Sequence, residues 1–123
     1  MLVDTREQGC KVVEYLKGLN ISFDVKQLFV GDYQIGNDCI VERKSAGDFI
    51  GSLLNERLNN QLQRMSFNFE NPILIVEGIV DEVLYYRKIK RDAYISSLSS
   101  CLSKVSMDGK QGKISFVMLS SPW

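Results

Sequence analysis

The stretch GDYQIGNDCIVERKSAGD, residues 31–48, decides the fold of this chain of 123 residues. Residues 33–35 and 39–44 are two extended runs, and the glycine-containing segment 36–38 between them is typical of a β-hairpin connection. Ser45, with Asp48 three residues later, resembles a capping box, which predicts that a helix begins where the second strand ends. The stretch therefore predicts a hairpin that runs directly into a helix.

Hydrophobic periodicity extends this pattern over the rest of the chain. The apolar run 72–76 is typical of a strand that is covered on both faces, so we expect it at the centre of the sheet. Residues 21–25 alternate between apolar and polar, which predicts a half-buried strand antiparallel to the hairpin strands. Together these segments predict a single mixed sheet with helices packed on its faces. The other expected elements are strands at 2–3 and 114–119 and helices over residues 12–19, 45–54, 54–65 and 92–105.

The composition excludes several kinds of catalytic site. The chain contains no histidine, which excludes Ser-His-Asp and Cys-His sites, zinc fingers that need histidine and a histidine general base. Its three widely spaced cysteines support neither a disulfide framework nor a cysteine-based zinc site, and they favour a reducing, intracellular setting. We therefore expect any catalysis to use carboxylates, lysine or water.

The formal net charge is zero, but the N-terminal half is acidic and the C-terminal half is basic. Binding of phosphate needs only local positive charge, and an acidic region can bind cations, so the balanced total does not exclude nucleic acid. The N-terminus lacks the apolar stretch of a signal peptide, and the longest markedly apolar run, 73–76, is too short to span a membrane. We expect no membrane association.

Asp32, Glu42 and Lys44 form the candidate catalytic site. Side chains alternate along a strand, so Glu42 and Lys44 share a face, and the hairpin brings Asp32 back towards Glu42. Two carboxylates and a lysine around one point suit phosphodiester hydrolysis, because carboxylates bind Mg²⁺, the metal acidifies water and the lysine stabilises negative charge. The alternative is a turn aspartate beside an ion pair on a solvated strand. The apolar run 39–41 favours the functional interpretation, since charges inside a strand need a reason.

The same residues resemble a known family. Gly31-Asp32-Tyr33, then Val41-Glu42-Arg43-Lys44-Ser45 and then Asp48, are similar to the GDx(n)ERKx(3)D signature of the XPF/Hef structure-specific endonucleases. Val3-Asp4-Thr5-Arg6-Glu7 resembles the acidic motif with which that family opens, and residues 57–62 resemble the helix after its core. The resemblance extends over nearly the whole chain, and it implies a restriction-endonuclease-like three-layer α/β/α fold with a central mixed sheet.

The resemblance also implies an activity, which is cleavage of branched DNA such as 3′ flaps, forks and junctions in DNA repair, with Mg²⁺ or Mn²⁺ as cofactor. The implied site residues are Asp32 and Glu42 as metal ligands, Lys44 as catalytic lysine, Arg43 and Asp48 as supporting catalytic residues, and Asp4 and Glu7 as the rest of an acidic cluster. Family members usually continue into a helix-hairpin-helix domain and some carry a helicase. We expect residues 1–123 to be a single nuclease domain without either, in the cytoplasm of a prokaryote or the nucleus of a eukaryote.

Four of these residues have structural alternatives. Strand alternation turns Arg43 away from Glu42, which indicates a structural ion pair or a buried anchor. Asp48 can simply cap its helix, where a carboxylate in the first turn is favourable. Asp4 and Glu7 can pair with neighbouring arginine or begin the next helix.

Two further segments favour contact with DNA. Arg57, Gln61 and Arg64 lie beside the apolar face of their predicted helix, at the rim of a cleft or in an ordinary boundary stripe. Residues 85–91 contain two tyrosines and four cations, a pattern suited to base stacking and phosphate contact, with a solvated loop as the alternative. The four cations are Arg87, Lys88, Lys90 and Arg91.

An apolar stripe in the segment 92–105 either joins two subunits or covers the sheet, and its members are Ile95, Leu98, Leu102 and Val105. The family resemblance favours a homodimer, with a heterodimer as the alternative. Two other functions stay open at this point. One is a noncatalytic DNA-binding or scaffold subunit of a nuclease dimer, and the other is an enzyme of the same fold that cuts RNA or resolves four-way junctions.

Overall fold

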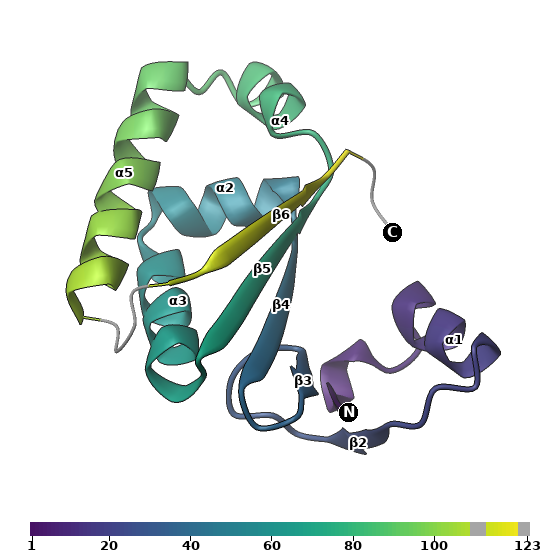
Figure 1. Ribbon diagram of the computed structural model, residues 1–123. Helices are drawn as coiled ribbons and strands as arrows, with labels where there is room; N and C mark the ends of the chain where they lie inside the picture. Colours follow the sequence, from purple (N-terminus) through teal and green to yellow (C-terminus); the bar gives the residue numbers. More distant parts are fainter. Residues whose placement is uncertain (109–112, 121–123) are drawn as a thin grey trace.

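The computed structural model describes residues 1–108 and 113–120. In this part of the chain a six-stranded mixed sheet has the strand order β2-β1-β3-β4-β5-β6 (Figure 1). β1 is parallel to β2 and antiparallel to β3, β3 is antiparallel to β4, and β4, β5 and β6 are parallel to one another. The strands are β1 (Leu2–Asp4), β2 (Asp24–Lys26), β3 (Tyr33–Ile35), β4 (Cys39–Ser45), β5 (Asn71–Glu77) and β6 (Ser115–Leu119).

Helices cover both faces of the sheet, which confirms the predicted three-layer α/β class. The helices α2, α3 and α5 pack on one face, and α1 packs on the other (Figure 1). No helix of residues 1–108 or 113–120 has the length and apolar character needed to cross a membrane. The helices are η1 (Thr5–Glu7), α1 (Lys11–Gly18), α2 (Ala46–Leu54), α3 (Arg57–Asn68), α4 (Val80–Tyr86) and α5 (Arg91–Asp108).

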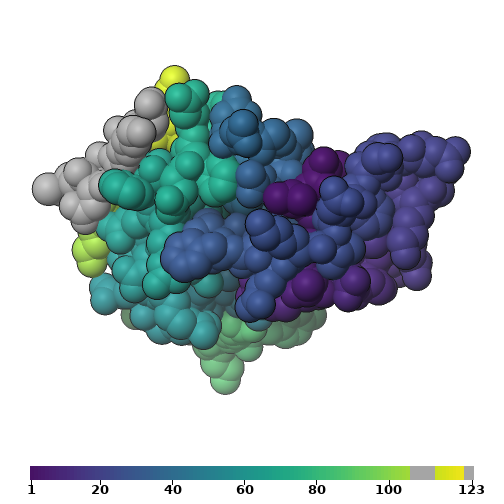
Figure 2. Space-filling view, turned by 90° about the horizontal axis from the view of Figure 1, so that it is seen from below, coloured from purple at the N-terminus to yellow at the C-terminus, as the bar shows by residue number. Residues whose placement is uncertain are grey.

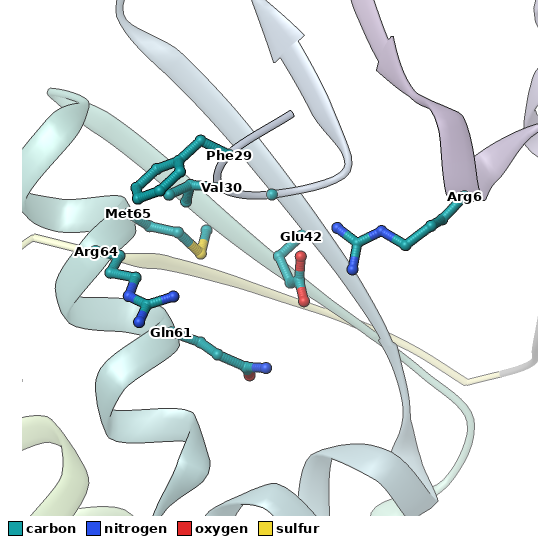
Figure 3. A pocket seen from close by; sticks show the side chains of 8 residues that line it. Arg6, Phe29, Val30, Glu42, Gln61, Arg64 and Met65 are labelled. Carbon is teal, nitrogen blue, oxygen red and sulfur yellow. The ribbon is translucent and has the colours of Figure 1, made fainter. Parts of the chain in front are cut away.

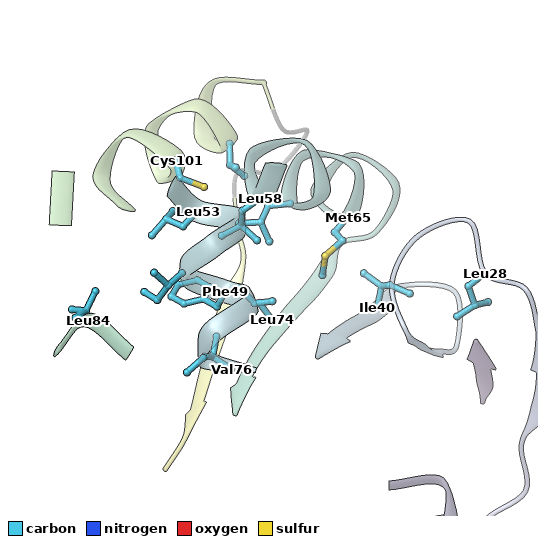
Figure 4. Close-up of a cluster of buried hydrophobic side chains, with 14 residues drawn as sticks. Leu28, Ile40, Phe49, Leu53, Leu58, Met65, Leu74, Val76, Leu84 and Cys101 are labelled. Carbon is cyan, nitrogen blue, oxygen red and sulfur yellow. The ribbon is translucent and has the colours of Figure 1, made fainter. Parts of the chain in front are cut away.

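The alternation of side chains along β4 divides the core in two. Ile40 is fully buried in the larger cluster, to which Phe49 of α2, Met65 of α3 and Leu74 of β5 also belong (Figure 4). Val41, the next residue, belongs to the smaller cluster under α1. Ser45 is the N-cap of α2, as predicted, because its hydroxyl accepts a hydrogen bond of 3.1 Å from the backbone N–H of Asp48. The charged residues that follow in β4 therefore point alternately to the two faces of the sheet.

Two predictions about the sheet are wrong. The strand within residues 21–25 does not pair with the hairpin, because β2 is an exposed edge strand parallel to β1. β5 lies between β4 and β6 rather than at the centre, and its Ile73 and Ile75 are only half-buried. Alternation and apolar runs report which side chains are buried, but they do not specify the neighbouring strand.

The helices differ from the prediction in two further ways. The core-facing positions of α5 are Tyr94, Leu98, Cys101 and Val105. Ile95 and Leu102 are instead 48% and 41% exposed, so the predicted stripe is split between two faces. α4 was not predicted, although its apolar residues at positions 80, 83 and 84 have helical spacing.

Candidate active site

The backbone holds Asp32 at the start of the hairpin, directly beside β4. Gly31 turns the chain with a φ of +77°, and the N–H of Asp32 donates to the carbonyl of Val41 at 2.8 Å. The carboxylate Oδ2 of Asp32 accepts a hydrogen bond of 2.8 Å from the backbone N–H of Arg43. Its side chain therefore lies on the same face as Glu42, and the two carboxyl groups share a hydrogen bond.

This juxtaposition changes the acidity of both groups. Burial, followed by the charge of Asp32, raises the pKa of Glu42 to about 7, although Lys44 and Arg6 act in the opposite direction. Burial is also the main reason that the pKa of Asp32 is raised. In the absence of a cation the pair therefore retains a proton close to neutral pH, because two adjacent carboxylates repel each other.

Lys44 completes the group on this face of the sheet. Its Nζ lies 3.9 Å from Oε2 of Glu42, and its side chain is largely buried. The structure thus brings together the three side chains that the hairpin was expected to bring together. The site combines two carboxyl groups with one ammonium group, and a buried ammonium can stabilise negative charge that develops nearby.

A cavity of about 150 Å³ opens above Glu42 (Figure 3). In Figure 3, Glu42 lies between Arg6 on one side and Gln61 and Arg64 of α3 on the other. Oε1 of Gln61 is buried and has no hydrogen-bond partner among residues 1–108 and 113–120. An unpaired buried amide oxygen is costly, so this oxygen is available to accept a hydrogen bond from, or to coordinate, a ligand in the cavity. The remaining lining residues are Phe29, Val30, Gly31 and Met65.

Sequence reasoning missed Arg6 and Phe29 as parts of this site. Nε of Arg6 donates to Oδ2 of Asp4 at 2.6 Å, and this bond directs the guanidinium towards the cavity. Arg6 lies in the motif VDTRE, which was singled out from the sequence. The functional interpretation of that motif considered only its acidic residues, so Arg6 was overlooked. Nothing local in the sequence indicates that the loop after β2 reaches the site.

Asp4 supports the site by holding Arg6 and the loop between β2 and β3 in position. Its carboxylate is fully buried and accepts hydrogen bonds from the N–H of Leu28 at 2.8 Å and from Arg6. Burial by itself would raise the pKa of Asp4, but these hydrogen bonds outweigh it and lower the pKa. Asp4 therefore anchors Arg6 and the loop before β3, and its oxygens are already engaged.

Arg43 occupies the opposite face, as strand alternation predicts. Its guanidinium donates to Glu7 at 2.6 Å and to Glu77 at 2.9 Å, and the Tyr33 hydroxyl donates to the same oxygen of Glu7 at 2.9 Å. Burial would lower the pKa of Arg43, whereas Glu77 and Glu7 raise it. This network joins β4, β5 and η1, so Glu7 is engaged in holding the N-terminal segment on the sheet.

The described residues contain no group of three or more acidic or cysteine side chains arranged to hold a metal ion. Oxygen donors of the right chemistry nevertheless lie close together, because Glu42 and the orphaned Oε1 of Gln61 line the cavity and the carboxyl group of Asp32 lies beside Glu42. A divalent cation would also relieve the repulsion that raises the pKa of Glu42. The donor set therefore fits Mg²⁺ or Mn²⁺ that retains several waters.

The remaining predicted site residues lie elsewhere. Asp48 is exposed in the first turn of α2, and neither it nor Arg57 lines the cavity. The basic segment follows α4, which Figure 1 places at the far end of β4 from β3. There Arg87 donates to the carbonyl of Gly47 at 3.1 Å and Arg91 pairs with Asp81 at 2.8 Å. Lys88 and Lys90 are exposed on the same segment.

The fold is thus a three-layer α/β domain with two carboxyl groups and a lysine together on one face of its sheet. Residues 3–117 match the ERCC4 domain. The chain therefore belongs to the ERCC4-domain family, and the XPF/Hef relationship predicted from the motif is confirmed.

Curated relatives and solved structures agree with this assignment. The chain is 40% identical over 80 residues to "3'-flap repair endonuclease Xpf" of Saccharolobus solfataricus, covering 65% of this chain and 34% of the relative. It is 35% identical over 127 residues to "DNA repair protein RAD1" of Saccharomyces cerevisiae, covering 99% of this chain and 12% of the relative. The structure of XPF from Aeropyrum pernix matches with a TM-score of 0.73 and 30% identity, covering 98% of this chain and 53% of that chain. The complex of that protein with DNA matches with the same TM-score over 56% of its chain.

Proposed function

We propose that this chain is the catalytic domain of a divalent-metal-dependent endonuclease that hydrolyses phosphodiester bonds in branched DNA, such as 3′ flaps, forks and junctions, during DNA repair. The observation that carries the proposal is the hydrogen-bonded pair Asp32 and Glu42, with Lys44 Nζ 3.9 Å from the glutamate. On a solvated strand these charged side chains would be exposed to water, and two acidic groups would not be buried next to each other. The relatives are DNA repair endonucleases or DNA repair proteins by name, which supports the same substrate class.

Asp32 and Glu42 would hold Mg²⁺ or Mn²⁺, with Gln61 as a further oxygen donor or as the residue that orients a bound water. When bound, such a cation acidifies water and screens the phosphate charge. The two carboxyl groups must lose the proton that they share before they can bind the cation. Because the pKa of Glu42 is raised, binding of the cation depends on pH.

The basic side chains around the cavity act on the DNA backbone. Arg6 and Arg64 lie on opposite walls, where both guanidinium groups can bind phosphate oxygens on either side of Glu42 (Figure 3). Lys44, closer to the acids, stabilises the negative charge that develops as the phosphodiester bond breaks. Arg43 acts through its backbone N–H, which holds Asp32 in position.

The test of the activity is a cleavage assay on a labelled 3′ flap with Mg²⁺, Mn²⁺ or EDTA. Wild-type protein should cut with either metal and not with EDTA, and Asp32→Ala and Glu42→Gln should abolish cutting while they retain the fold and most DNA binding. Asp24→Ala, which changes an exposed aspartate on the edge strand β2, is the matched control. Cleavage by Asp32→Ala would disprove the site. Flap binding without cleavage in any metal would instead support a noncatalytic scaffold subunit.

The exposed side of α5 supports the proposal that a second copy of this chain is its protein partner. Ile95 and Leu102 lie seven residues apart on the exposed side of α5, and they are 48% and 41% exposed. Apolar side chains with this spacing on one helix face are suited to a two-fold helix pair. We expect a homodimer in sedimentation, and we expect the double variant Ile95→Asp and Leu102→Asp to be monomeric and folded. A wild-type monomer would exclude this part of the proposal.

A further inference from the structure

Phe29 is 84% exposed, a fraction far above that of the apolar residues on either side of it. It lies in the loop between β2 and β3, where Leu28 is buried and Val30 packs against the core. The N–H of Leu28 donates to the buried carboxylate of Asp4 at 2.8 Å. The backbone on both sides of the ring is therefore anchored, and the ring is held in water rather than left on a loose loop.

The ring stands at the edge of the proposed catalytic cavity. Phe29 lines the same cavity as Glu42, Arg6 and Arg64, and Figure 3 shows it above Met65, on the α3 side. Figure 2 views the molecule from below and shows the N-terminal part of the chain, purple to blue, beside the teal helical part. The loop therefore joins the two walls of the site on this side of the molecule.

A second cavity of about 250 Å³ lies next to the same ring. Its walls combine apolar groups of Leu28, Val30 and Phe69 with the amide side chains of Gln34 and Asn68. A flat group with apolar faces and a polar edge suits such walls. Phe29 is shared by the two cavities, so one ligand with a charged part and a flat part can occupy both.

We propose that Phe29 stacks on an unpaired nucleobase of the DNA strand whose phosphate enters the cavity of Glu42. The inference deepens the proposed nuclease function and rests on it. Two guanidinium groups that suit phosphate and one exposed ring beside them match the two parts of a nucleotide. A paired base is already stacked on both faces, so the ring selects a base at a branch or in a single-stranded arm. This contact gives the site a preference for branched DNA over continuous duplex.

The test uses flap DNA that carries 2-aminopurine at the first unpaired position next to the branch, with EDTA present so that no cleavage occurs. Wild-type protein should quench the fluorescence, because stacking on an aromatic ring quenches this base. Phe29→Ala should lose the quenching and bind the flap about fivefold to a hundredfold more weakly, the range expected for one lost base–aromatic stack. Phe29→Trp should restore both. Affinity for continuous duplex should be the same for all three proteins.

Phe67→Ala is the matched control, because Phe67 is 64% exposed and lines neither cavity. Wild-type quenching and affinity in Phe29→Ala would overturn the inference, and so would an equal loss of affinity for flap and duplex. Dissociation of a dimer by Phe29→Ala would also overturn it, because the ring would then contact protein. The readout needs no cleavage, so it separates the two proposals: cleavage by Asp32→Ala would refute the catalytic site and leave the stacking result intact.

Discussion

The substitution Glu42→Gln should stabilise the protein at alkaline pH while it abolishes the proposed activity. In the wild type, burial and the neighbouring Asp32 raise the pKa of Glu42 from its ordinary 4.5 to about 7. The folded state therefore binds this proton more tightly than the unfolded state does. As a result, the free energy of unfolding falls as the pH rises from 4.5 towards 7, and the loss is complete above that range.

The size of the effect follows from the displacement of the pKa. At about 1.4 kcal/mol for each pKa unit, the change from 4.5 to about 7 corresponds to at most about 3.5 kcal/mol. Gln keeps the shape of the side chain and removes the charge. We therefore expect Glu42→Gln to be about 1 to 3 kcal/mol more stable than the wild type at pH 8, and nearly equal to it at pH 4.5.

The assay is urea unfolding of both proteins in EDTA at several pH values, followed by circular dichroism. Glu14→Gln, which changes an exposed glutamate of α1, is the control and should match the wild type throughout. Addition of Mg²⁺ should raise the stability of the wild type and leave Glu42→Gln almost unchanged, because a ligand stabilises only a protein that binds it. A variant with a pH-independent difference from the wild type, or one less stable at pH 8, would refute the account of the buried acid pair.

Three further outcomes follow from the same contacts. Arg43→Ala should destabilise the protein by about 3 to 5 kcal/mol, because it removes a guanidinium that forms ion pairs with two largely buried glutamates. Urea unfolding measures this, and a loss below about 1 kcal/mol would show that the network is replaceable. Gly31→Ala should cost at least about 1 kcal/mol, because its φ is +77° and a Cβ would meet the buried side chain of Ile40; unchanged stability would contradict this. Lys44→Ala should lower the cleavage rate about 10²- to 10³-fold with little change in flap affinity, and an unchanged rate would remove the lysine from the proposed site.

The local part of the site was predictable from the sequence because it depends on rules that act over a few residues. Alternation along one strand places Glu42 and Lys44 on one face and Arg43 on the other, and the short hairpin returns Asp32 to their side. The Ser45 N-cap likewise defines the start of α2. Each of these features needs only the neighbouring sequence to be specified.

Other features depend on which distant segments pack together, and periodicity carries little information about that. The pairing of β2 was predicted wrongly, and of the four residues in the predicted stripe of α5 only Leu98 and Val105 face the core. Arg6 and Phe29 reach the cavity because the buried carboxylate of Asp4 holds both the N-terminal segment and the loop before β3. Glu7 and Glu77 meet at Arg43 from segments far apart in the sequence.

The sequence by itself determined the family, the α/β class and the three side chains on the hairpin, since these depend on motif spacing and strand alternation. Only the tertiary structure decided the order of the edge strands, the walls of the cavity and the exposure of Phe29. The physical reason is that hydrophobic burial has no direction. Hydrophobic burial requires that the apolar face of a helix or sheet is covered, and only the packing of the whole chain determines which segment covers it.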